Sequence, residues 1–368
     1  MRLLSLDIFR GMTVFFMIIV NTPGTWGAVY APLLHADWHG FSPTDLVFPS
    51  FLFAVGASVG IVLPRMAEKF TPQQVYRKII KRALLIFVIG FIIYKFPFVK
   101  WQADGSLAFI DLSTTRIMGV LQRIGLAYGL AVAILYAFSL RKAIWITTGI
   151  LITYWMILFG FGDYSLEGNI GLWLDKQILG ADHLYGGEGI PFDPEGLLST
   201  LPCIGNIVAG YATVYYMCQK NANYETLFRL ALVGAGLIAA ACMWHYAFPI
   251  NKKLWTSSYV LLTSGIGMLM LVGLHYLLDK KRKGRAWAQF FAPMGKNPLA
   301  IYALSVFLVR ILLFVRTGEG TNLYGSTYET VFRPMGDHLG SFLFALVFTM
   351  ICWAVAWWLD KQKVYLRV

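Results

Sequence analysis

The sequence is poor in charge: charged residues make up 14% of its 368 residues, whereas a soluble domain has about 25%. Acidic residues are the scarcest, with 19 Asp and Glu against 31 Lys and Arg, so that the formal net charge is +12. Such an excess of positive charge can indicate nucleic-acid binding. Here, however, the basic residues lie in short segments between long apolar runs. That arrangement is typical of loops that set membrane orientation, and we expect no nucleic-acid partner.

Cysteines and glycosylation sequons are also scarce or absent. The four cysteines lie in or at the end of apolar segments, and no spacing among them is typical of a metal site. We therefore expect buried apolar thiols and no metal. No Asn-x-Ser/Thr sequon occurs in the sequence, which favours a prokaryotic source.

Apolar runs long enough to cross a bilayer recur from end to end. A bilayer core about 30 Å thick requires roughly 20 apolar residues in helical form. The 12 Trp and 19 Tyr suit aromatic belts at the two membrane interfaces. The sequence thus predicts an all-α, polytopic membrane protein, with residues 1–368 forming a single bundle of about ten transmembrane helices. The predicted spans are 6–22, 44–64, 79–97, 116–138, 143–161, 196–217, 227–247, 256–278, 298–315 and 341–359.

The distribution of basic residues predicts the orientation of this bundle. If the N-terminus is inside, most of the Lys and Arg fall in the inner segments, and the long outer segment 162–195 contains only Lys176. The positive-inside rule then places both termini in the cytoplasm, and we expect a bacterial inner-membrane location. The apolar stretch Ile8–Val20 is short, but no convincing small-residue cleavage site follows it, so we expect a retained helix rather than a signal peptide.

Four segments have the pattern of a helix start, with a capping residue followed by proline. Ser42-Pro43-Thr44-Asp45 precedes the second span, and Thr71-Pro72-Gln73-Gln74 predicts a short surface helix. Asp193-Pro194-Glu195 and Asn297-Pro298 have the same form before the sixth and ninth spans.

Ionisable residues within the spans are costly and are often functional. Arg123 lies about two turns into the fourth predicted span, where we expect a functional or bundle-organising role. Arg10 and Asp7 are three residues apart on the first helix, so they are also able to pair with each other.

His35 is the candidate base, because histidine transfers protons near neutral pH. It lies in the outer segment 22–43, which contains no Lys or Arg. Asp45 can orient its imidazole as well as cap the second helix, and Asn21 can cap the first helix or bind a reacting carbonyl oxygen. His39 and Asp37 with His35 would form a metal site only if the loop were helical.

Motifs along almost the whole chain resemble the heparan-alpha-glucosaminide N-acetyltransferase family. They occur in the order of that family and are Leu6–Gly11, Val20-Asn21, His35–Gly40, Thr44–Pro49, Gly119–Ile124, Phe192–Gly196, Pro249–Thr256 and Gly295–Pro298.

The resemblance implies an acetyl-CoA-dependent N-acetyltransferase that accepts acetyl-CoA on the cytosolic side and acetylates a glucosamine amine on the far side. It also implies that His35 is the essential loop histidine and Asn21 its partner. The sequence lacks the N-terminal luminal domain and the extra helix of the lysosomal form, so we expect a smaller amino sugar or a glycan fragment as acceptor. Membrane lipid and a second copy in a homodimer are the other expected partners.

Two sets of residues are the candidates for binding these substrates. Cations should surround the phosphates of CoA. The candidates are the cations Arg10, Arg123 and Lys296, together with the amide of Asn297. Carboxylates, amides and an aromatic ring suit a sugar, and the candidates at the outer ends of spans six to eight are Asp193, Glu195, Asn251, Lys253 and Trp255. Direct transfer and a transiently acetylated His35 both remain open. A small-solute transporter or channel is the alternative function, although no paired half-repeats are evident.

Overall fold

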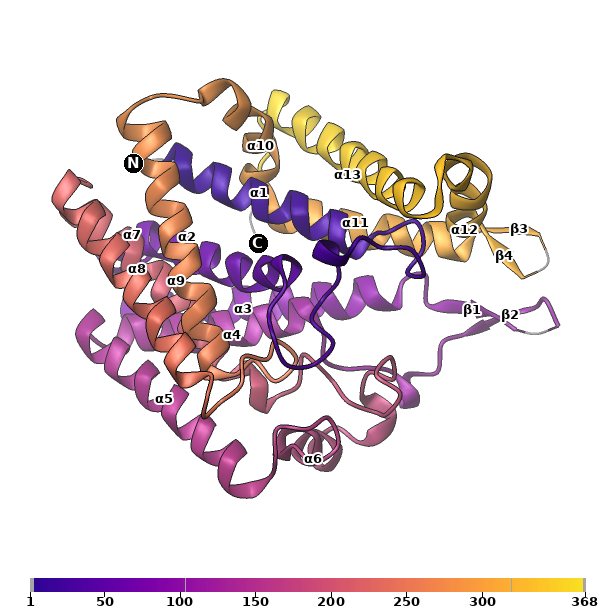
Figure 1. The fold of residues 1–368 in the computed structure, drawn as a ribbon, viewed down its shortest axis with the longest axis horizontal. Helices are drawn as coiled ribbons and strands as arrows, with labels where there is room; N and C mark the ends of the chain where they lie inside the picture. The colour runs from indigo at the N-terminus through magenta and orange to yellow at the C-terminus, as the bar shows by residue number, and fades with distance from the viewer. Residues whose placement is uncertain (1–2, 103, 319, 367–368) are drawn as a thin grey trace.

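The computed structural model describes residues 3–102, 104–318 and 320–366, and most of them are helical (Figure 1). The α-helices are α1 (Leu4–Asn21), α2 (Val47–Lys69), α3 (Pro72–Lys95), α4 (Val120–Ala137), α5 (Leu140–Phe161), α6 (Ile170–Ile178), α7 (Cys203–Gln219), α8 (Tyr224–Trp244), α9 (Ser257–Leu274), α10 (Arg285–Lys296), α11 (Pro298–Phe314), α12 (Leu323–Thr327) and α13 (Asp337–Lys361).

The described strands form two short antiparallel hairpins that project from the helices (Figure 1). They are β1 (Val99–Trp101) with β2 (Leu107–Phe109), in the register that pairs Lys100 with Ala108, and β3 (Arg316–Gly318) with β4 (Thr321–Asn322). The one-turn elements that matter for the site are the 3₁₀ turns η1 (Ala31–Leu33), η2 (Pro43–Leu46) and η5 (Leu198–Thr200). The fold is therefore the all-α, polytopic class expected from the sequence.

Fewer helices than the predicted ten have the length and apolar character of a membrane span. Among the described residues, seven helices are long and apolar enough to cross a membrane, and the pair α10–α11, bent by 75°, would make an eighth. The seven are α1, α2 with η2, α4, α5, α8, α9 with the π-turn η6 (His275–Lys280), and α13.

Helices occupy the remaining predicted spans, but they differ from the expected form. The short surface helix expected at Thr71 and the span 79–97 are one continuous helix, α3, which Thr71 caps through the N–H of Gln74. Basic residues in the first half of α3 reduce its apolar length. Helix α7 has 17 residues, fewer than the roughly 20 that cross a bilayer.

Close backbone approach at glycine brings α2 and α7 together. A Cβ atom at Gly56 would lie 1.9 Å from the carbonyl oxygen of Ile207, and one at Gly210 would lie 2.0 Å from that of Phe53. Neither position can accept a side chain without moving a helix. Small residues at helix interfaces are the usual device for tight packing in membranes, where apolar burial gives little preference for one partner. This contact places the N-terminal end of α2 beside the helix that follows the Asp193 loop.

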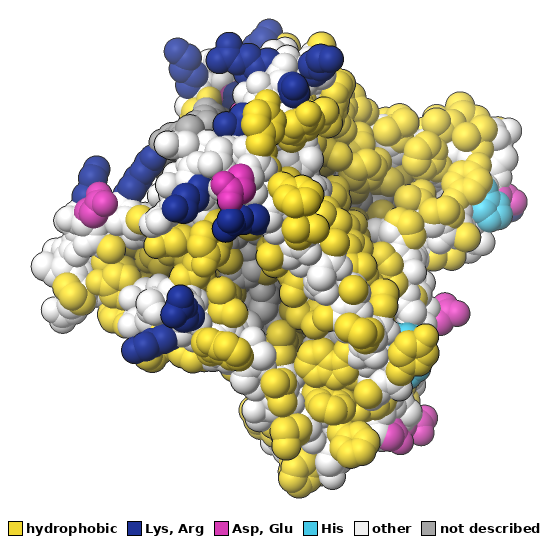
Figure 2. Space-filling view, turned by 60° about the vertical axis from the view of Figure 1, so that its left-hand side comes forward, with side chains coloured by type: hydrophobic (Ala, Val, Ile, Leu, Met, Phe, Trp, Pro, Cys, Tyr) yellow, Lys and Arg dark blue, Asp and Glu magenta, His cyan; other side chains and the backbone are white. Residues whose placement is uncertain are grey.

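The surface has the apolar character of a membrane protein (Figure 2). Apolar side chains cover most of the visible face, and Lys and Arg gather at the upper and left end of it. Three connections meet in the middle of the molecule: the α1–α2 loop, the loop before α7 and the α8–α9 turn (Figure 1). Gly40 donates its N–H to the carbonyl of Ile250 (2.8 Å), and Trp38 donates its indole N–H to the carbonyl of Tyr164 (2.7 Å). These bonds hold the candidate residues of separate loops in one place.

Candidate active site

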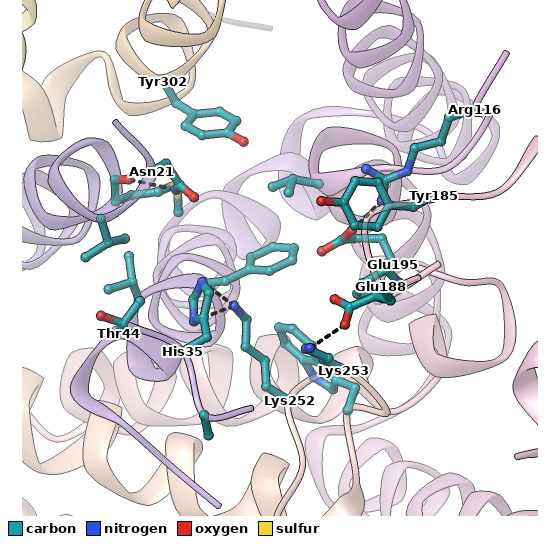
Figure 3. Close-up of a pocket in the computed structure, with 18 residues that line it drawn as sticks. Asn21, His35, Thr44, Arg116, Tyr185, Glu188, Glu195, Lys252, Lys253 and Tyr302 are labelled. Carbon is teal, nitrogen blue, oxygen red and sulfur yellow. Dashed lines mark hydrogen bonds and ion pairs between the residues drawn. The ribbon is translucent and has the colours of Figure 1, made fainter. Parts of the chain in front are cut away.

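A cavity of about 250 Å³ opens where these loops meet the ends of α1, α2, α4 and α11. Figure 3 shows its polar side chains, which face one another across the cavity. They are Asn21, His35, Thr44, Arg116, Tyr185, Glu188, Glu195, Lys252, Lys253 and Tyr302.

His35 lines this cavity and is held from behind by Asp45. Its Nδ1 lies 2.7 Å from Oδ1 of Asp45. The side chain of Asp45 is buried, whereas that of His35 is 36% exposed. The other carboxylate oxygen of Asp45 accepts the N–H groups of Ala36 (3.1 Å) and Ser42 (2.9 Å). Asp45 thus serves both expected roles, because it organises the start of the α2 segment and orients the imidazole.

Lys252 lies against the same imidazole. Its Nζ is 2.9 Å from Nδ1 and 2.9 Å from Nε2 of His35, and 3.8 Å from Oδ1 of Asp45. Burial lowers the pKa of His35 below 6.5 and the charge of Lys252 lowers it further, against the opposing effects of Asp45 and Glu195. Burial also lowers the pKa of Lys252 to about 8. At neutral pH the pair is therefore a neutral imidazole beside an ammonium group.

Asn21, the C-terminal residue of α1, reaches the same cavity as His35 (Figure 3). Its Nδ2 donates a hydrogen bond to the carbonyl of Met17 (2.7 Å). One of the two amide hydrogens is thereby used, and the second is available to a ligand. The structure thus brings the predicted amide, base and carboxylate together.

The opposite side of the cavity is built on Arg116, which precedes α4. Its Nη2 donates to Asp193 (2.6 Å) and Glu195 (2.6 Å), and its Nε donates to Asp193 (2.8 Å). The guanidinium also lies 4.7 Å from the ring centroid of Tyr185. Burial opposes the charge of Arg116, but the two carboxylates outweigh it and raise the pKa of Arg116. Burial likewise raises the pKa of Glu195, but the nearby cations, Arg116 foremost, bring it below its ordinary value.

Of the residues predicted to bind sugar, Glu195 and Lys253 face the cavity with polar groups. Lys253 forms an ion pair with Glu188 (2.6 Å). Asp193 lies behind Arg116 rather than at a helix start, because α7 begins only at Cys203. Asn251 is buried and accepts the N–H of Leu254 (2.8 Å).

Trp255 lines the floor of the cavity but is only 1% exposed. It packs edge-on against Phe48 and Tyr259 and donates its indole N–H to Asn206 (3.0 Å). The ring of Trp255 therefore does not present the open face that stacking on a sugar requires. Arg123 is fully buried, lies 5.0 Å from the Trp255 ring and bonds Ser199, so it lies near the cavity lined by His35. It lies in the first turn of α4, nearer the helix start than the predicted span implies.

The predicted CoA-binding residues lie apart from one another. Arg10 pairs with Asp7, as their spacing allows, lies 3.4 Å from the hydroxyl of Ser58, and lines a second cavity of about 80 Å³. Lys296 forms an ion pair with Asp360 (2.5 Å).

Asn297 stands between α10 and α11, as the proline motif predicts, but its side chain does not cap the helix. It binds the C-terminal segment instead, through the carbonyl of Val364 (3.0 Å) and the N–H of Leu366 (2.8 Å).

Sequence reasoning missed six of the polar residues of the cavity, namely Thr44, Arg116, Tyr185, Glu188, Lys252 and Tyr302. Lys252 and Thr44 lie within the recognised motifs Pro249–Thr256 and Thr44–Pro49, and Arg116 lies three residues before the motif Gly119–Ile124. Tyr185 and Glu188 lie in a long loop, and Tyr302 lies in an apolar helix; no sequence pattern distinguishes them.

Comparisons with known proteins agree with the resemblance seen in the motifs. The model of the heparan-alpha-glucosaminide N-acetyltransferase catalytic family matches residues 2–231. Human heparan-alpha-glucosaminide N-acetyltransferase is 28% identical, in an alignment that covers 82% of this chain and 52% of the human protein. The mouse protein of the same name is also 28% identical, with 82% of this chain and 53% of the mouse protein covered. The chain spans about half the length of the curated relatives that it matches. Since the family match covers more than half of the chain, the protein belongs to the heparan-alpha-glucosaminide N-acetyltransferase catalytic family.

Proposed function

We propose that this protein is a transmembrane N-acetyltransferase that moves the acetyl group of cytosolic acetyl-CoA to the amine of a glucosamine-type sugar on the outer side, with His35 as the general base. The observation that carries the proposal is the position of His35 at a cavity, with its Nδ1 2.7 Å from the buried carboxylate of Asp45. The relatives are named as N-acetyltransferases of a glucosaminide, which supports the same reaction.

The chemistry of this transfer matches the residues in the cavity. The amine nitrogen attacks the thioester carbonyl carbon, the carbon–sulfur bond breaks, and the amine must lose one proton. Neutral His35 accepts that proton and returns it to the departing thiolate, so that the product amide and CoA thiol are both neutral. Asp45 stabilises the imidazolium while the proton is held there. The remaining amide hydrogen of Asn21 can bind the carbonyl oxygen as it becomes negative.

The donor would reach this cavity from the inner half of the bundle. The cavity lined by Arg10 also contains Phe51, Ile124 and Leu299, whereas the outer cavity contains Phe48, Val120 and Tyr302 on the same three helices. These pairs are three or four residues apart, so the two cavities are about one helical turn from each other along α2, α4 and α11. Of the predicted candidates, Arg10 is therefore the one that we propose for the phosphates of acetyl-CoA, and Lys296 and Asn297 would act instead in packing the C-terminal segment.

The acceptor would occupy the side of the cavity opposite His35. Glu188, Glu195 and Lys253 provide charged groups for sugar hydroxyls and for an ammonium. Asp193 and Asn251 would act indirectly. Asp193 holds Arg116 in place, and Asn251 shapes the turn that carries Lys253. Trp255 forms the floor of the site, and an amino sugar or a glycan fragment is the acceptor class.

The topology that suits this reaction has both termini in the cytoplasm of a bacterium. Helices α3, α7 and α11 would complete ten spans, and the inner end would carry the clusters of Lys and Arg seen in Figure 2. A reporter fused after residue 368 should then be cytoplasmic, and a label at residue 169 should be accessible from outside. A label at residue 169 that reacts only from the cytoplasm would contradict this topology.

The reaction itself is tested with purified protein, radiolabelled acetyl-CoA and glucosamine. We expect radiolabel in N-acetylglucosamine, formed in proportion to enzyme, and none with glucose, which has the same hydroxyl pattern except for the amine. A protein that binds acetyl-CoA but transfers no acetyl group to any amino sugar or glycan fragment would refute the proposal. Uptake of labelled glucosamine by proteoliposomes without acetylation would instead support the transporter alternative.

A further inference from the structure

The ammonium group of Lys252 is placed to act on His35 rather than on a carboxylate. Its Nζ lies at the same distance, 2.9 Å, from both ring nitrogens of His35. Since Cε1 lies between the two nitrogens, a position in the ring plane at this distance would clash with it, so Nζ lies over the face of the imidazole. The nearest carboxylate oxygen, on Asp45, is 3.8 Å away, beyond hydrogen-bond distance.

A rigid turn before α9 holds Lys252 in this position. Asn251 donates its N–H to Thr256 (3.0 Å) and accepts the N–H of Leu254 on its side chain (2.8 Å). The carbonyl of Ile250 accepts the N–H of Gly40 from the loop that carries His35 (2.8 Å). The Lys252 side chain is 20% exposed, so it is neither a mobile surface lysine nor a group sealed in the interior.

The negative charge of Asp45 does not by itself explain the position of Lys252. The carboxylate already has partners in His35, in the N–H groups of Ala36 and Ser42, and in the Ser42 hydroxyl. A cation placed against an imidazole instead disfavours the protonated ring, because two like charges repel.

The charged groups facing this pair come from four elements: η2, the loop before α7, the α8–α9 turn and α4. Asp45 on η2 and Glu195 in the loop before α7 favour a charged His35, whereas Lys252 disfavours it. Lys252 itself faces Asp45, Glu195, Lys253 and Arg123. Burial is the largest effect on both groups and lowers the pKa of each, to about 8 for Lys252 and to a value below 6.5 for His35. At a pH between these two pKa values, Lys252 carries its proton and His35 is neutral.

We propose that Lys252 is a positioning residue that keeps His35 in its neutral, proton-accepting form. The inference deepens the proposed function and rests on His35 being the base of that reaction. Asp45 holds the ring hydrogen on Nδ1, and Nε2 then carries the lone pair that receives the proton of the amine. Lys252 thereby sets the lower end of the pH range in which the base is available.

The direct test is an NMR titration of the full-length protein with ¹⁵N-labelled histidine rings in detergent micelles, with His35→Gln used to assign the signal. In Lys252→Met we expect the pKa of His35 to rise by about one unit or more, because a like charge has been removed. Lys252→Arg keeps the charge and should restore a low pKa. Lys253→Met is the matched control, since Lys253 lines the same cavity but pairs with Glu188, and it should move the pKa of His35 much less.

The pH dependence of kcat/KM gives a second readout. The acidic limb of the Lys252→Met profile should move to higher pH by the same amount as the titration, so that between pH 8 and pH 6 the variant loses more of its activity than the wild type does. The titration requires no acyl transfer, so it decides the role of Lys252 even if the proposed reaction is not found.

A purely structural role for Lys252 would lower the melting temperature and leave the pKa of His35 unchanged, and that result would overturn the inference. Lys252→Gln is titrated beside Lys252→Met, so that the outcome does not depend on one variant remaining folded. An increase of the pKa in either uncharged variant, reversed in Lys252→Arg, supports it.

Discussion

The buried carboxylate of Asp45 lies 2.7 Å from Nδ1 of His35, and it also accepts the N–H groups at both ends of the loop between them. One side chain thus shapes the loop and orients the ring at its start. Any change at Asp45 should therefore affect folding and chemistry together, whereas a change at His35 should affect chemistry alone.

His35→Ala should abolish acetyl transfer while leaving the protein folded and able to bind acetyl-CoA. Loss of a general base costs about a hundred- to ten-thousand-fold in rate, and the partly exposed ring of His35 contributes little to the core. Initial rates, acetyl-CoA affinity and melting temperature should be measured in one detergent. His39→Ala is the control, because His39 is a second histidine of the same loop and contacts Asn251, with 3.3 Å between its Nδ1 and Nδ2 of Asn251. The effect of His39→Ala on the rate should be mild. Wild-type rates in His35→Ala would remove the proposed mechanism.

Asn21→Ala should slow transfer by roughly a hundred- to a thousand-fold, which is what one oxyanion donor typically contributes. The side chain is exposed to the cavity, and its single hydrogen bond within the protein is made to its own helix. The loss should therefore fall on kcat, with the KM for the acceptor little changed. Asn21→Asp has the same shape without the amide donor and should be equally slow; a fast Asn21→Asp enzyme would contradict the role in oxyanion binding.

Asp45→Asn should give a rate between those of the wild type and His35→Ala, together with a lower melting temperature. The amide retains one acceptor oxygen but loses the negative charge that stabilises the imidazolium, and it cannot satisfy the same set of donors. Thermal unfolding and initial rates measured on the same preparation separate the two effects. An unchanged melting temperature would show that Asp45 does not organise the loop.

Arg116→Gln should destabilise the protein by about 3 kcal/mol, because it leaves the buried carboxylate of Asp193 without its cation. Arg333→Gln is the matched control, since its partner Glu329 is exposed and exposed ion pairs contribute about 0–1 kcal/mol. Equal unfolding midpoints for the two variants would indicate that Asp193 finds another partner.

Asp175→Asn should raise the stability at pH 7.5, and by about half as much at pH 5. Burial raises the pKa of Asp175 to about 6, so the folded state binds its proton more tightly than the unfolded state does. Stability from this group is fully present below the ordinary carboxyl pKa and is lost as the pH rises through about 6. Above that range the ionised carboxylate costs about 3 kcal/mol.

The amide introduced by Asp175→Asn would keep an oxygen in the place of the one that accepts the N–H of Leu197 (3.0 Å). Melting temperatures of both proteins at the two pH values provide the measurement. A gain at pH 5 as large as that at pH 7.5 would rule out ionisation as the cause.

Much of the architecture is determined by local sequence. Apolar runs of helical length place α1, α2, α5, α8 and α13 close to their predicted positions, because the length of an apolar run is a property of consecutive residues. The α2 start at Ser42–Asp45 and the α3 cap at Thr71 were also predictable, since capping is decided within four residues.

Where a boundary depends on distant contacts, the prediction was wrong. Asp193-Pro194 has the local form of a helix start, but Arg116, 77 residues earlier, binds Asp193 and the helix begins only at Cys203. The predicted spans that are not among the long apolar helices differ in length or charge. Basic residues occupy the first half of α3, and α7 and α11 have 17 residues each.

The sequence by itself determined the fold class, the family motifs and the choice of His35, Asp45 and Asn21, which are close together along the chain. Only the tertiary structure decided which charges join them. Lys252 is 217 residues from His35, yet its amine contacts the imidazole because the α8–α9 turn is tied to the α1–α2 loop. The same packing buries Trp255 under Arg123. A residue type specifies what a side chain is able to do, but the packing of separate helices decides which side chains meet.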